Sequence, residues 1–335
     1  HSEASLYEAY RLGFGEPIPI SAEHGQGMGE LYSSLLPFTV EYGQSEADEM
    51  KYDIGNTKKI EEDGKHSPLQ IAIVGRPNVG KSTLVNRLIG EERLLTGPEA
   101  GITRDAIGVQ WSHESRPIRL IDTAGLRRKS KVTNKIENLS ANDTYRAIQY
   151  AQLVVLVLDG NTMLEKQDLT IARQVIDEGR VLIVAVNKWD SVRDRKTSLQ
   201  NLKNRLETSL SQVRDVPVIR LSALKGSRVQ NLLPEAFKYF DIWNRRVPTG
   251  ELNRWLEYVT ERHPPPMIAG RRIRLRYITQ AKTRPPTFVV FSSRGQALSE
   301  DYRRYLANGI REKFHLPGVP IRLLVRQGHN PYASG

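Results

Sequence analysis

Short apolar runs alternate with longer amphipathic stretches along the middle of the chain. Each run is as long as a buried strand, and the stretches between the runs are long enough to form crossover helices. An uninterrupted apolar run indicates a strand that is covered on both faces, as in a mostly parallel sheet. We therefore predict a doubly wound α/β domain over residues 68–245. Its predicted strands are Leu69–Val74, Ile118–Ile121, Leu153–Leu158, Val181–Val186 and Val216–Leu221.

The pattern changes in residues 246–330, for which we predict a second, smaller α+β domain. Apolar residues recur at helical spacing over Leu252–Val259, and a second helix is predicted over Glu300–Phe314. Strand-like segments lie between and after these helices. The predicted strands of this domain are Arg272–Ile278, Thr287–Ser292 and Ile321–Val325. The predicted element order is α-β-β-α-β.

The first 67 residues divide into two parts. Residues 41–67 are polar, acidic and without apolar periodicity, which predicts a flexible linker. Within residues 1–40, Ile20-Ser21-Ala22 matches Leu221-Ser222-Ala223 at an offset of 201 residues, and each triplet follows a proline-containing apolar segment. We expect residues 1–40 to be the C-terminal remnant of an earlier domain of the kind predicted for residues 68–245. Chance similarity over so short a stretch is the alternative.

Charge and composition narrow the choice of partners. The net charge is +11, and residues 246–335 hold 16 Lys and Arg against 6 Asp and Glu. Such a basic segment favours a polyanionic partner, although a merely solvated basic face is the alternative. The chain has no cysteine, which excludes disulfides and thiolate metal sites. No apolar run is long enough to span a bilayer.

A phosphate-binding loop is predicted directly after the first strand. Gly75-Arg76-Pro77-Asn78-Val79-Gly80-Lys81-Ser82 has the spacing G-x-x-x-x-G-K-[ST] and precedes a helical pattern. Glycines let the backbone wrap around phosphates, so that its N–H groups and the helix N-terminus point at negative charge. Lys81 is expected to reach the β- and γ-phosphates, and the Ser82 hydroxyl to bind Mg²⁺.

Two further segments are expected around the γ-phosphate. Asp122-Thr123-Ala124-Gly125 ends the strand Ile118–Ile121, where a carboxylate can hold Mg²⁺ through water and the Gly125 N–H can sense the γ-phosphate. Between this segment and the phosphate loop lies Gly101-Ile102-Thr103-Arg104-Asp105. Thr103 is the candidate second Mg²⁺ hydroxyl, on a switch segment.

The base is predicted to be guanine. Asn187-Lys188-Trp189-Asp190 follows the strand Val181–Val186, and the Asp190 carboxylate can accept hydrogen bonds from guanine N1–H and the 2-amino group. Adenine does not offer these two donors, so the wrong base would leave the carboxylate unpaired. Ser222-Ala223 is expected to bring a backbone N–H near guanine O6.

These motifs resemble one family closely. GRPNVGKS, GITRD, DTAGLRRKSKV, NKWD and SAL resemble the second GTPase domain of the EngA/Der family, tandem GTPases that act in ribosome assembly. PPPMIAGRRIRLRY, PPTFVVF, LPGVPIRLLVR and NPYA resemble the KH-like C-terminal domain of that family, and GFGEPIPISAEHGQGMGELY resembles the end of its first GTPase domain. The resemblance implies that this chain holds only the tail of that first domain.

The resemblance also implies the chemistry and the partners. Leu126 stands where many GTPases have a water-orienting glutamine. The family implies slow, Mg²⁺-dependent hydrolysis of GTP to GDP, with a K⁺ ion held partly by Asn78; an ordinary turn-stabilising role for Asn78 is the alternative. The implied partners are the large ribosomal subunit and its rRNA. We expect a monomer without membrane contact, in the bacterial cytoplasm or, if the source is eukaryotic, in the mitochondrial matrix or plastid stroma.

The candidate site residues follow from these motifs. The predicted nucleotide-binding residues are Asn78, Val79, Gly80, Lys81, Ser82, Thr83, Asp122, Gly125, Asn187, Lys188, Asp190, Ser222, Ala223 and Leu224. The predicted catalytic residues are Lys81, Thr103 and Gly125, and the predicted Mg²⁺ ligands are Ser82, Thr103 and Asp122.

An RNA-binding face is predicted on the first strand of the C-terminal domain. Arg272, Arg274 and Arg276 alternate with Ile273 and Leu275, so we expect the three arginines on one face, near Arg271, and the two apolar side chains toward the core. A row of guanidinium groups suits phosphate binding, whereas arginines that only solubilise the sheet are the alternative. No GxxG signature is present, which disfavours sequence-specific clamping of single-stranded RNA. A rival function is a GTPase switch for RNA modification or membrane-associated signalling.

Overall fold

The computed structural model describes residues 68–96, 104–105, 108–121, 141–267, 273–293 and 298–327, with a few isolated positions before them. The chain divides into two compact units, residues 1–155 and 156–335. The strands form a seven-stranded sheet in the order β2-β3-β4-β1-β5-β6-β7 and a three-stranded sheet in the order β10-β9-β8. Together with the helices these sheets confirm the predicted fold class, a mostly parallel α/β domain followed by a small α+β domain.

The first unit contains the N-terminal part of the large sheet. Its strands are β1 (Leu69–Val74), β2 (Arg104–Asp105), β3 (Gly108–His113), β4 (Arg116–Ile121) and the start of β5 (Leu153–Asp159). β1 pairs with β4 in parallel, and it contacts the helices α3 (Lys81–Thr96) and α5 (Ala141–Tyr150). The burial of nearly every β1 residue explains its mostly apolar sequence, in which buried Gln70 is the one polar residue.

Strand β3 was not predicted from the sequence. It pairs antiparallel with β4 through a two-residue turn at Glu114 and Ser115, whose φ angles are 48° and 65°. Two positive φ values are typical of the tight hairpin turns that favour Asn-Gly. The sequence lacked that signal because two non-glycine residues adopt the left-handed conformation here.

The second unit carries the rest of the large sheet and the whole small sheet. Its first elements are β5 from residue 156, α6 (Lys166–Asp177), β6 (Val181–Asn187), α7 (Arg195–Ser209), β7 (Val218–Arg220) and α8 (Leu232–Trp243). β6 and β7 pair in parallel, and all seven β6 residues are buried. The strand predicted over Val216–Leu221 is shorter than expected, because the strand covers only Val218–Arg220 and Leu221 already belongs to the following loop.

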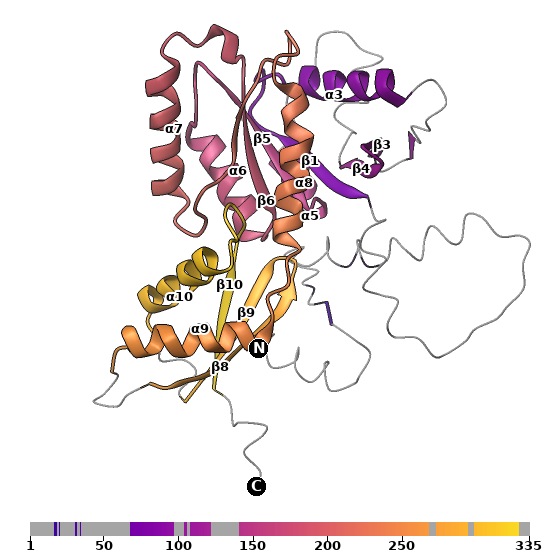
Figure 1. The fold of residues 1–335 in the computed structure, drawn as a ribbon. Helices are drawn as coiled ribbons and strands as arrows, with labels where there is room; N and C mark the ends of the chain where they lie inside the picture. Colours follow the sequence, from indigo (N-terminus) through magenta and orange to yellow (C-terminus); the bar gives the residue numbers. More distant parts are fainter. Residues whose placement is uncertain are drawn as a thin grey trace, which may run out of the picture. The chain divides into compact units, whose positions relative to one another are not determined.

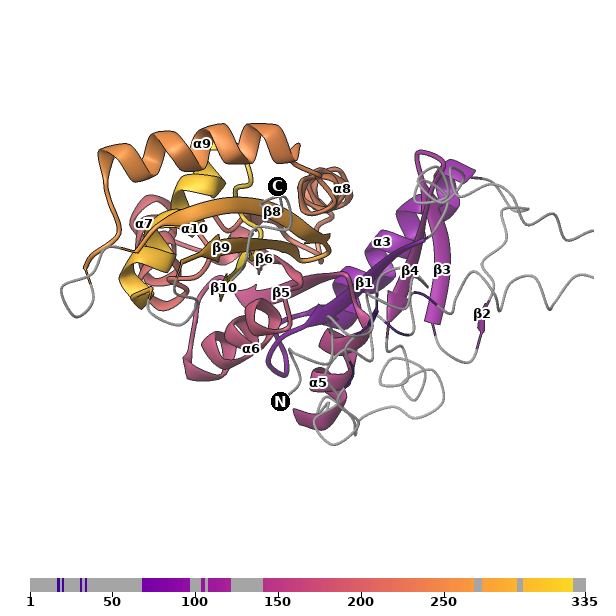
Figure 2. The same ribbon diagram turned by 90° about the horizontal axis from the view of Figure 1, so that it is seen from below.

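The small sheet has the predicted α-β-β-α-β order. Its elements are α9 (Thr249–Arg262), β8 (Leu275–Thr283), β9 (Pro286–Ser292), α10 (Glu300–Lys313) and β10 (Arg322–Gln327). β8 pairs antiparallel with β9, and β9 pairs in parallel with β10 (Figure 1). α9 lies along β8, as Figure 2 shows from below, and α10 contacts β10. The first strand of this sheet, β8, was predicted over Arg272–Ile278; it begins three residues later and extends to Thr283.

Polar contacts fasten the small sheet to two loops of the α/β elements within the second unit. Near the turn after α6, Arg322 of β10 donates to the carbonyl of Asp177 at 3.0 Å. The same turn is held to α8 by the indole of Trp243, which donates to the Gly179 carbonyl at 3.0 Å. After α7, the guanidinium of Arg311 donates to Gln212 at 2.8 Å. Burial lowers the pKa of Arg311 to about 10, and this hydrogen bond partly replaces the lost water.

Gly318 occupies the closest approach between these elements. Its φ of +69° lies in the left-handed region, and its N–H donates to the carbonyl of Arg214 at 2.8 Å. A Cβ added there would lie 2.4 Å from the ring of Tyr239 and 3.0 Å from the carbonyl of Asp215. Any side chain at this position is therefore both strained and obstructed.

Among the described residues, no helix is both long and apolar enough to cross a membrane.

We expect Gly318→Ala to lower the free energy of unfolding by about 1–3 kcal/mol, because the methyl group must displace Tyr239 or the backbone. The matched control is Gly250→Ala, since Gly250 lies in α9 with no atom within 4 Å of an added Cβ. That control should be neutral or stabilise by up to about 1 kcal/mol. Urea unfolding of both variants measures the difference, and equal stabilities would contradict the tight approach at Gly318.

Candidate nucleotide site

The predicted phosphate loop connects β1 to α3. Asn78 has φ 64° and Gly80 has φ 95°, so the loop turns through the left-handed region twice before the helix begins. The helix then starts with a hydrogen bond of 3.0 Å from Leu84 N–H to the Gly80 carbonyl. Val79 is buried and anchors the loop between these turns. The strand, loop and helix therefore follow the order that a phosphate loop requires.

Lys81 folds back over this loop. Its ammonium group donates to the carbonyls of Gly75 at 2.9 Å and Arg76 at 2.6 Å. The lysine is thus held against the same loop that is predicted to bind the phosphates. Ser82 follows in the first turn of α3 and is half-buried, so its hydroxyl lies beside the same loop, where a hard oxygen ligand suits Mg²⁺.

Several candidate residues lie outside the described residues. They include Thr103, Asp122 and Gly125, together with Leu126. Two of the three predicted Mg²⁺ ligands are in this group. Their oxygen donors fit Mg²⁺ by chemistry, and their role stays a prediction.

Asn187 organises the predicted base-recognition loops. It is the last residue of β6, is only 3% exposed, and its side-chain oxygen accepts a hydrogen bond of 2.9 Å from the Ala223 N–H. Trp189 N–H donates to the Leu221 carbonyl at 3.1 Å, which adds a second link between the two loops. The segments after β6 and β7 are therefore joined, as the sequence predicted for two parts of one base site.

Lys188 pairs with a residue that sequence reasoning missed. Its ammonium lies 2.7 Å from a carboxylate oxygen of Asp159, the last residue of β5. Burial acts to raise the pKa of Asp159, but the hydrogen bond from Lys188 and the backbone N–H of Asn161 outweigh it and lower this pKa. The signal was present as Asp-Gly-Asn directly after an apolar run. Asp159 fixes the lysine beside the base-recognition loops.

Asp190, the predicted specificity residue, lies in the short 3₁₀ turn η3 (Trp189–Ser191). Hydrogen bonds from Ser222 and Lys225 lower the pKa of its carboxyl group, which therefore stays ionised at neutral pH. The Lys225 ammonium lies 3.0 Å from the carboxylate. Ser222 was predicted at this site, whereas Lys225 was not. Leu224, also predicted at this site, is 77% exposed.

Gly160 permits the close packing of these loops. Its N–H donates to the Asn187 carbonyl at 2.8 Å. A Cβ at this position would lie 2.7 Å from Val192 and 3.0 Å from the same carbonyl. Glycine is therefore required here by space, because any larger residue would push the turn that carries Asp190 away from β5.

The predicted RNA-binding arginines are only partly described. Arg274 and Arg276 are exposed, and Arg271 and Arg272 lie outside the described residues. Ile273 is buried as predicted, and Leu275, the next residue expected toward the core, is half-buried between exposed Arg274 and Arg276. A register shift between Leu275 and Tyr277 interrupts the alternation and makes Ile278 the next core residue. A bulge of this kind inverts the facing of the side chains that follow it, here up to a second register shift between Gln280 and Lys282.

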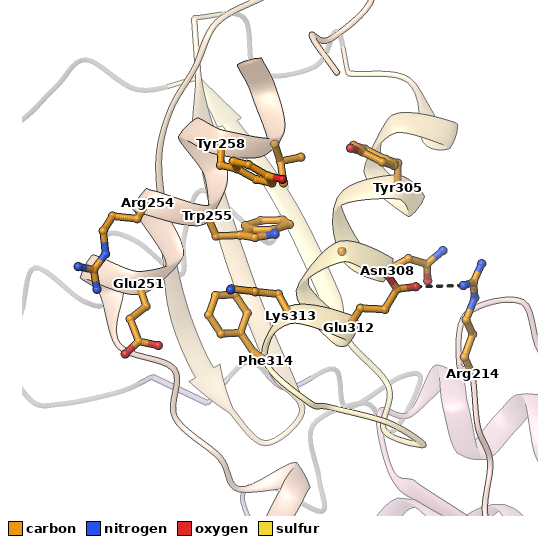
Figure 3. Close-up of a pocket in the computed structure, with 12 residues that line it drawn as sticks. Arg214, Glu251, Arg254, Trp255, Tyr258, Tyr305, Asn308, Glu312, Lys313 and Phe314 are labelled. Carbon is orange, nitrogen blue, oxygen red and sulfur yellow. Dashed lines mark hydrogen bonds and ion pairs between the residues drawn. The ribbon is translucent and has the colours of Figure 1, made fainter. Parts of the chain in front are cut away.

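A hollow of about 1050 Å³ lies between α9 and α10, the two helices of the small α+β domain. Figure 3 shows the aromatic side chains Trp255, Tyr258 and Tyr305 along it and the ion pair of Arg214 with Glu312 at its side. Its lining carries three cations and two carboxylates, so it has little net charge. A phosphate backbone needs a larger excess of cations. This hollow therefore does not replace the strand arginines as the candidate phosphate-binding face.

We expect Gly160→Ala to weaken the binding of GDP and GTP about tenfold, because overpacking of this size displaces Asp190 at a loss of about 1–2 kcal/mol. Gly90→Ala is the matched control, since Gly90 lies in α3 with no atom within 4 Å of an added Cβ. Titration with fluorescent GDP measures both variants. Unchanged affinity in Gly160→Ala would show that the loop after β5 does not support the base site.

Comparison with known proteins assigns the chain to a family. A family model described as "50S ribosome-binding GTPase" matches residues 70–188, and one described as the KH-domain-like C-terminal domain of EngA bacterial GTPases matches residues 246–326. GTPase Der of Parvibaculum lavamentivorans is 50% identical over 99% of this chain and 72% of its own length. The GTPase Der proteins of Novosphingobium aromaticivorans and Brucella melitensis are 50% and 47% identical, each over 99% of this chain and 73% of their own length. The chain belongs to the EngA/Der family of GTPases.

Proposed function

We propose that this protein is a GTP-binding and GTP-hydrolysing switch that binds ribosomal RNA and acts in assembly of the large ribosomal subunit. The observation that carries the enzymatic part is the link between the two base-recognition loops, in which buried Asn187 holds the Ala223 N–H at 2.9 Å beside ionised Asp190. The ribosomal part is supported by family membership and by the basic C-terminal region. We further propose that the protein acts as a monomer in the bacterial cytoplasm.

Base selection follows from the charge of Asp190. An ionised carboxylate only accepts hydrogen bonds, and guanine offers N1–H and its 2-amino group on one edge. Adenine presents no such pair of donors, so its binding would forgo both hydrogen bonds that guanine makes to the carboxylate, at a large loss of affinity. Ala223 and Leu224 would complete the pocket, the first through its N–H and the second by covering the ring.

The phosphates are proposed to bind at the loop before α3. Backbone N–H groups at the start of this helix favour negative charge, and Lys81 would turn from its carbonyl partners to the β- and γ-phosphates. Ser82, Thr103 and Asp122 would hold Mg²⁺, which supplies neutralisation of the phosphate charge when bound. The Gly125 N–H would report the presence of the γ-phosphate to the segment that follows it.

Hydrolysis lacks the usual water-orienting glutamine, because Leu126 can neither accept nor donate a proton. We propose that K⁺, held partly by Asn78, supplies positive charge near the phosphates, the role that an arginine finger has in other GTPases. Asn78 is exposed in the phosphate loop with a left-handed backbone.

GTP turnover should accordingly be at least about tenfold faster in potassium chloride than in sodium chloride, which corresponds to 1.4 kcal/mol in the barrier. Asn78→Asp should change this ratio, whereas Asn86→Asp, on the exposed face of α3, should not. Aspartate tolerates the left-handed conformation as asparagine does, so the loop is expected to survive the change. Equal turnover in the two salts would exclude a role for K⁺.

The RNA contact is proposed to involve Arg274 and Arg276, which are exposed beside the exposed ring of Tyr277. A guanidinium group can donate two parallel hydrogen bonds to the oxygens of one phosphate, and each neutralised phosphate releases counterions.

The nucleotide is proposed to control this contact. Since a ligand shifts a two-state equilibrium only by its differential affinity for the two states, the GTP form must bind the subunit more tightly than the GDP form.

The test is co-sedimentation with ribosomal subunits across a salt series, with GDP and with a non-hydrolysable GTP analogue. Arg274→Glu with Arg276→Glu should weaken binding in both nucleotide states and lower the logarithmic salt slope by about one unit for each lost phosphate contact. Lys203→Glu with Arg205→Glu is the charge-matched control, because both residues are exposed on α7. If nucleotide makes no difference, the protein is not a GTP-dependent ribosome binder, which would favour the rival RNA-modification or membrane-associated switch. If the two charge variants behave alike, these arginines are not the RNA face.

A further inference from the structure

The specificity carboxylate of Asp190 already has a cationic partner within the protein. The Lys225 ammonium lies 3.0 Å from Asp190 Oδ2, and the Ser222 hydroxyl also hydrogen-bonds this carboxylate. The Asp190 side chain is only 29% exposed, whereas that of Lys225 is 64% exposed. The lysine therefore lies on the solvent side of the carboxylate, from which a ligand would approach.

The backbone fixes the position of this lysine. Ser222 and Ser227 form an isolated bridge, with Ser222 N–H donating to the Ser227 carbonyl at 3.0 Å. Within that tight loop, Lys225 N–H lies 3.3 Å from the Ser222 hydroxyl oxygen, which accepts from it. The loop that presents Ala223 to the base thus also presents Lys225 to Asp190. The ion pair follows from the geometry of the loop, although the long lysine side chain remains free to swing into solvent.

We propose that Lys225 is a latch that competes with guanine for Asp190, so that a guanine nucleotide binds only when the lysine swings away. This inference rests on the proposed function, because it takes Asp190 as the guanine-binding residue. A base that uses both carboxylate oxygens needs the position in which the ammonium lies. The latch thereby lowers the fraction of protein that is ready to bind, and the apparent dissociation constant rises in inverse proportion to that fraction.

The size and form of the effect follow from the exposure of the pair. Exposed ion pairs of this kind change an equilibrium about two- to fivefold, and salt screens them. Because the latch acts on the base and not on the phosphates, it should affect GDP and GTP equally. Because the lysine is displaced before the nucleotide is bound, it should slow association and leave dissociation unchanged.

The experiment measures association and dissociation rates of fluorescent GDP and of a fluorescent GTP analogue on the full chain. Lys225→Ala should raise the association rate about two- to fivefold for both nucleotides, and the gain should vanish as salt is raised. Lys225→Arg should resemble the wild type, since it keeps a cation at the same place. Lys238→Ala is the control, because Lys238 forms a comparable exposed pair with Glu235 at 3.1 Å on α8. An unchanged or slower association in Lys225→Ala would overturn the latch.

Repeating the experiment in an Asp190→Asn variant separates this proposal from the assignment of Asp190 as the base-binding residue. Asp190→Asn removes the carboxylate that Lys225 binds and should shift preference from guanine to xanthine nucleotides, because the amide can donate to a carbonyl at C2. Adding Lys225→Ala to Asp190→Asn should then have no further effect on binding of a xanthine nucleotide. If Asp190→Asn keeps its guanine preference, the base assignment fails. If that assignment holds but Lys225→Ala is still additive, the lysine acts through some other contact and the latch is wrong.

Discussion

The base-recognition half of this protein depends on one buried amide. Asn187 ends a strand in which every residue is buried, and a polar side chain in such a place must satisfy its hydrogen-bonding groups within the protein. Its oxygen does so at the Ala223 N–H, which brings the loop after β7 against the turn after β6. The positions of Asp190, Ser222 and Lys225 all follow from that link. A hydrogen bond in the protein interior thus helps to fix the geometry of the loops that are proposed to recognise the base.

Much of this arrangement was predictable from the sequence, and the reasons are physical. Buried parallel strands have continuous apolar sequences, so β1, β5 and β6 were recognisable almost to the residue. The phosphate loop and the base motif were recognisable because their chemistry demands fixed residue types at fixed spacing. Their position after strands followed from the same pattern.

What was missed has equally physical causes. β3 pairs through a turn without glycine or asparagine, and the bulge at the start of β8 reverses the facing of its side chains without any mark in the residue pattern. Asp159 and Lys225 were missed because their partners are distant in sequence or lie beyond the recognised motif. Ion pairs depend on three-dimensional proximity, and a single sequence shows residue types without showing which of them meet.

The fastening of the small sheet has a consequence for modularity. The two matched family models leave residues 189–245 between them, and the second begins at residue 246, as if the chain could be divided there into independent parts. Across this point the structure places Tyr239 against Gly318 and the guanidinium of Arg284 at 5.9 Å from the ring of Phe240. A cut at that point would uncover a row of aromatic rings on α8 and leave it to self-associate. The start of the second family model is therefore not a boundary of folding, because the aromatic face of α8 joins the residues on its two sides.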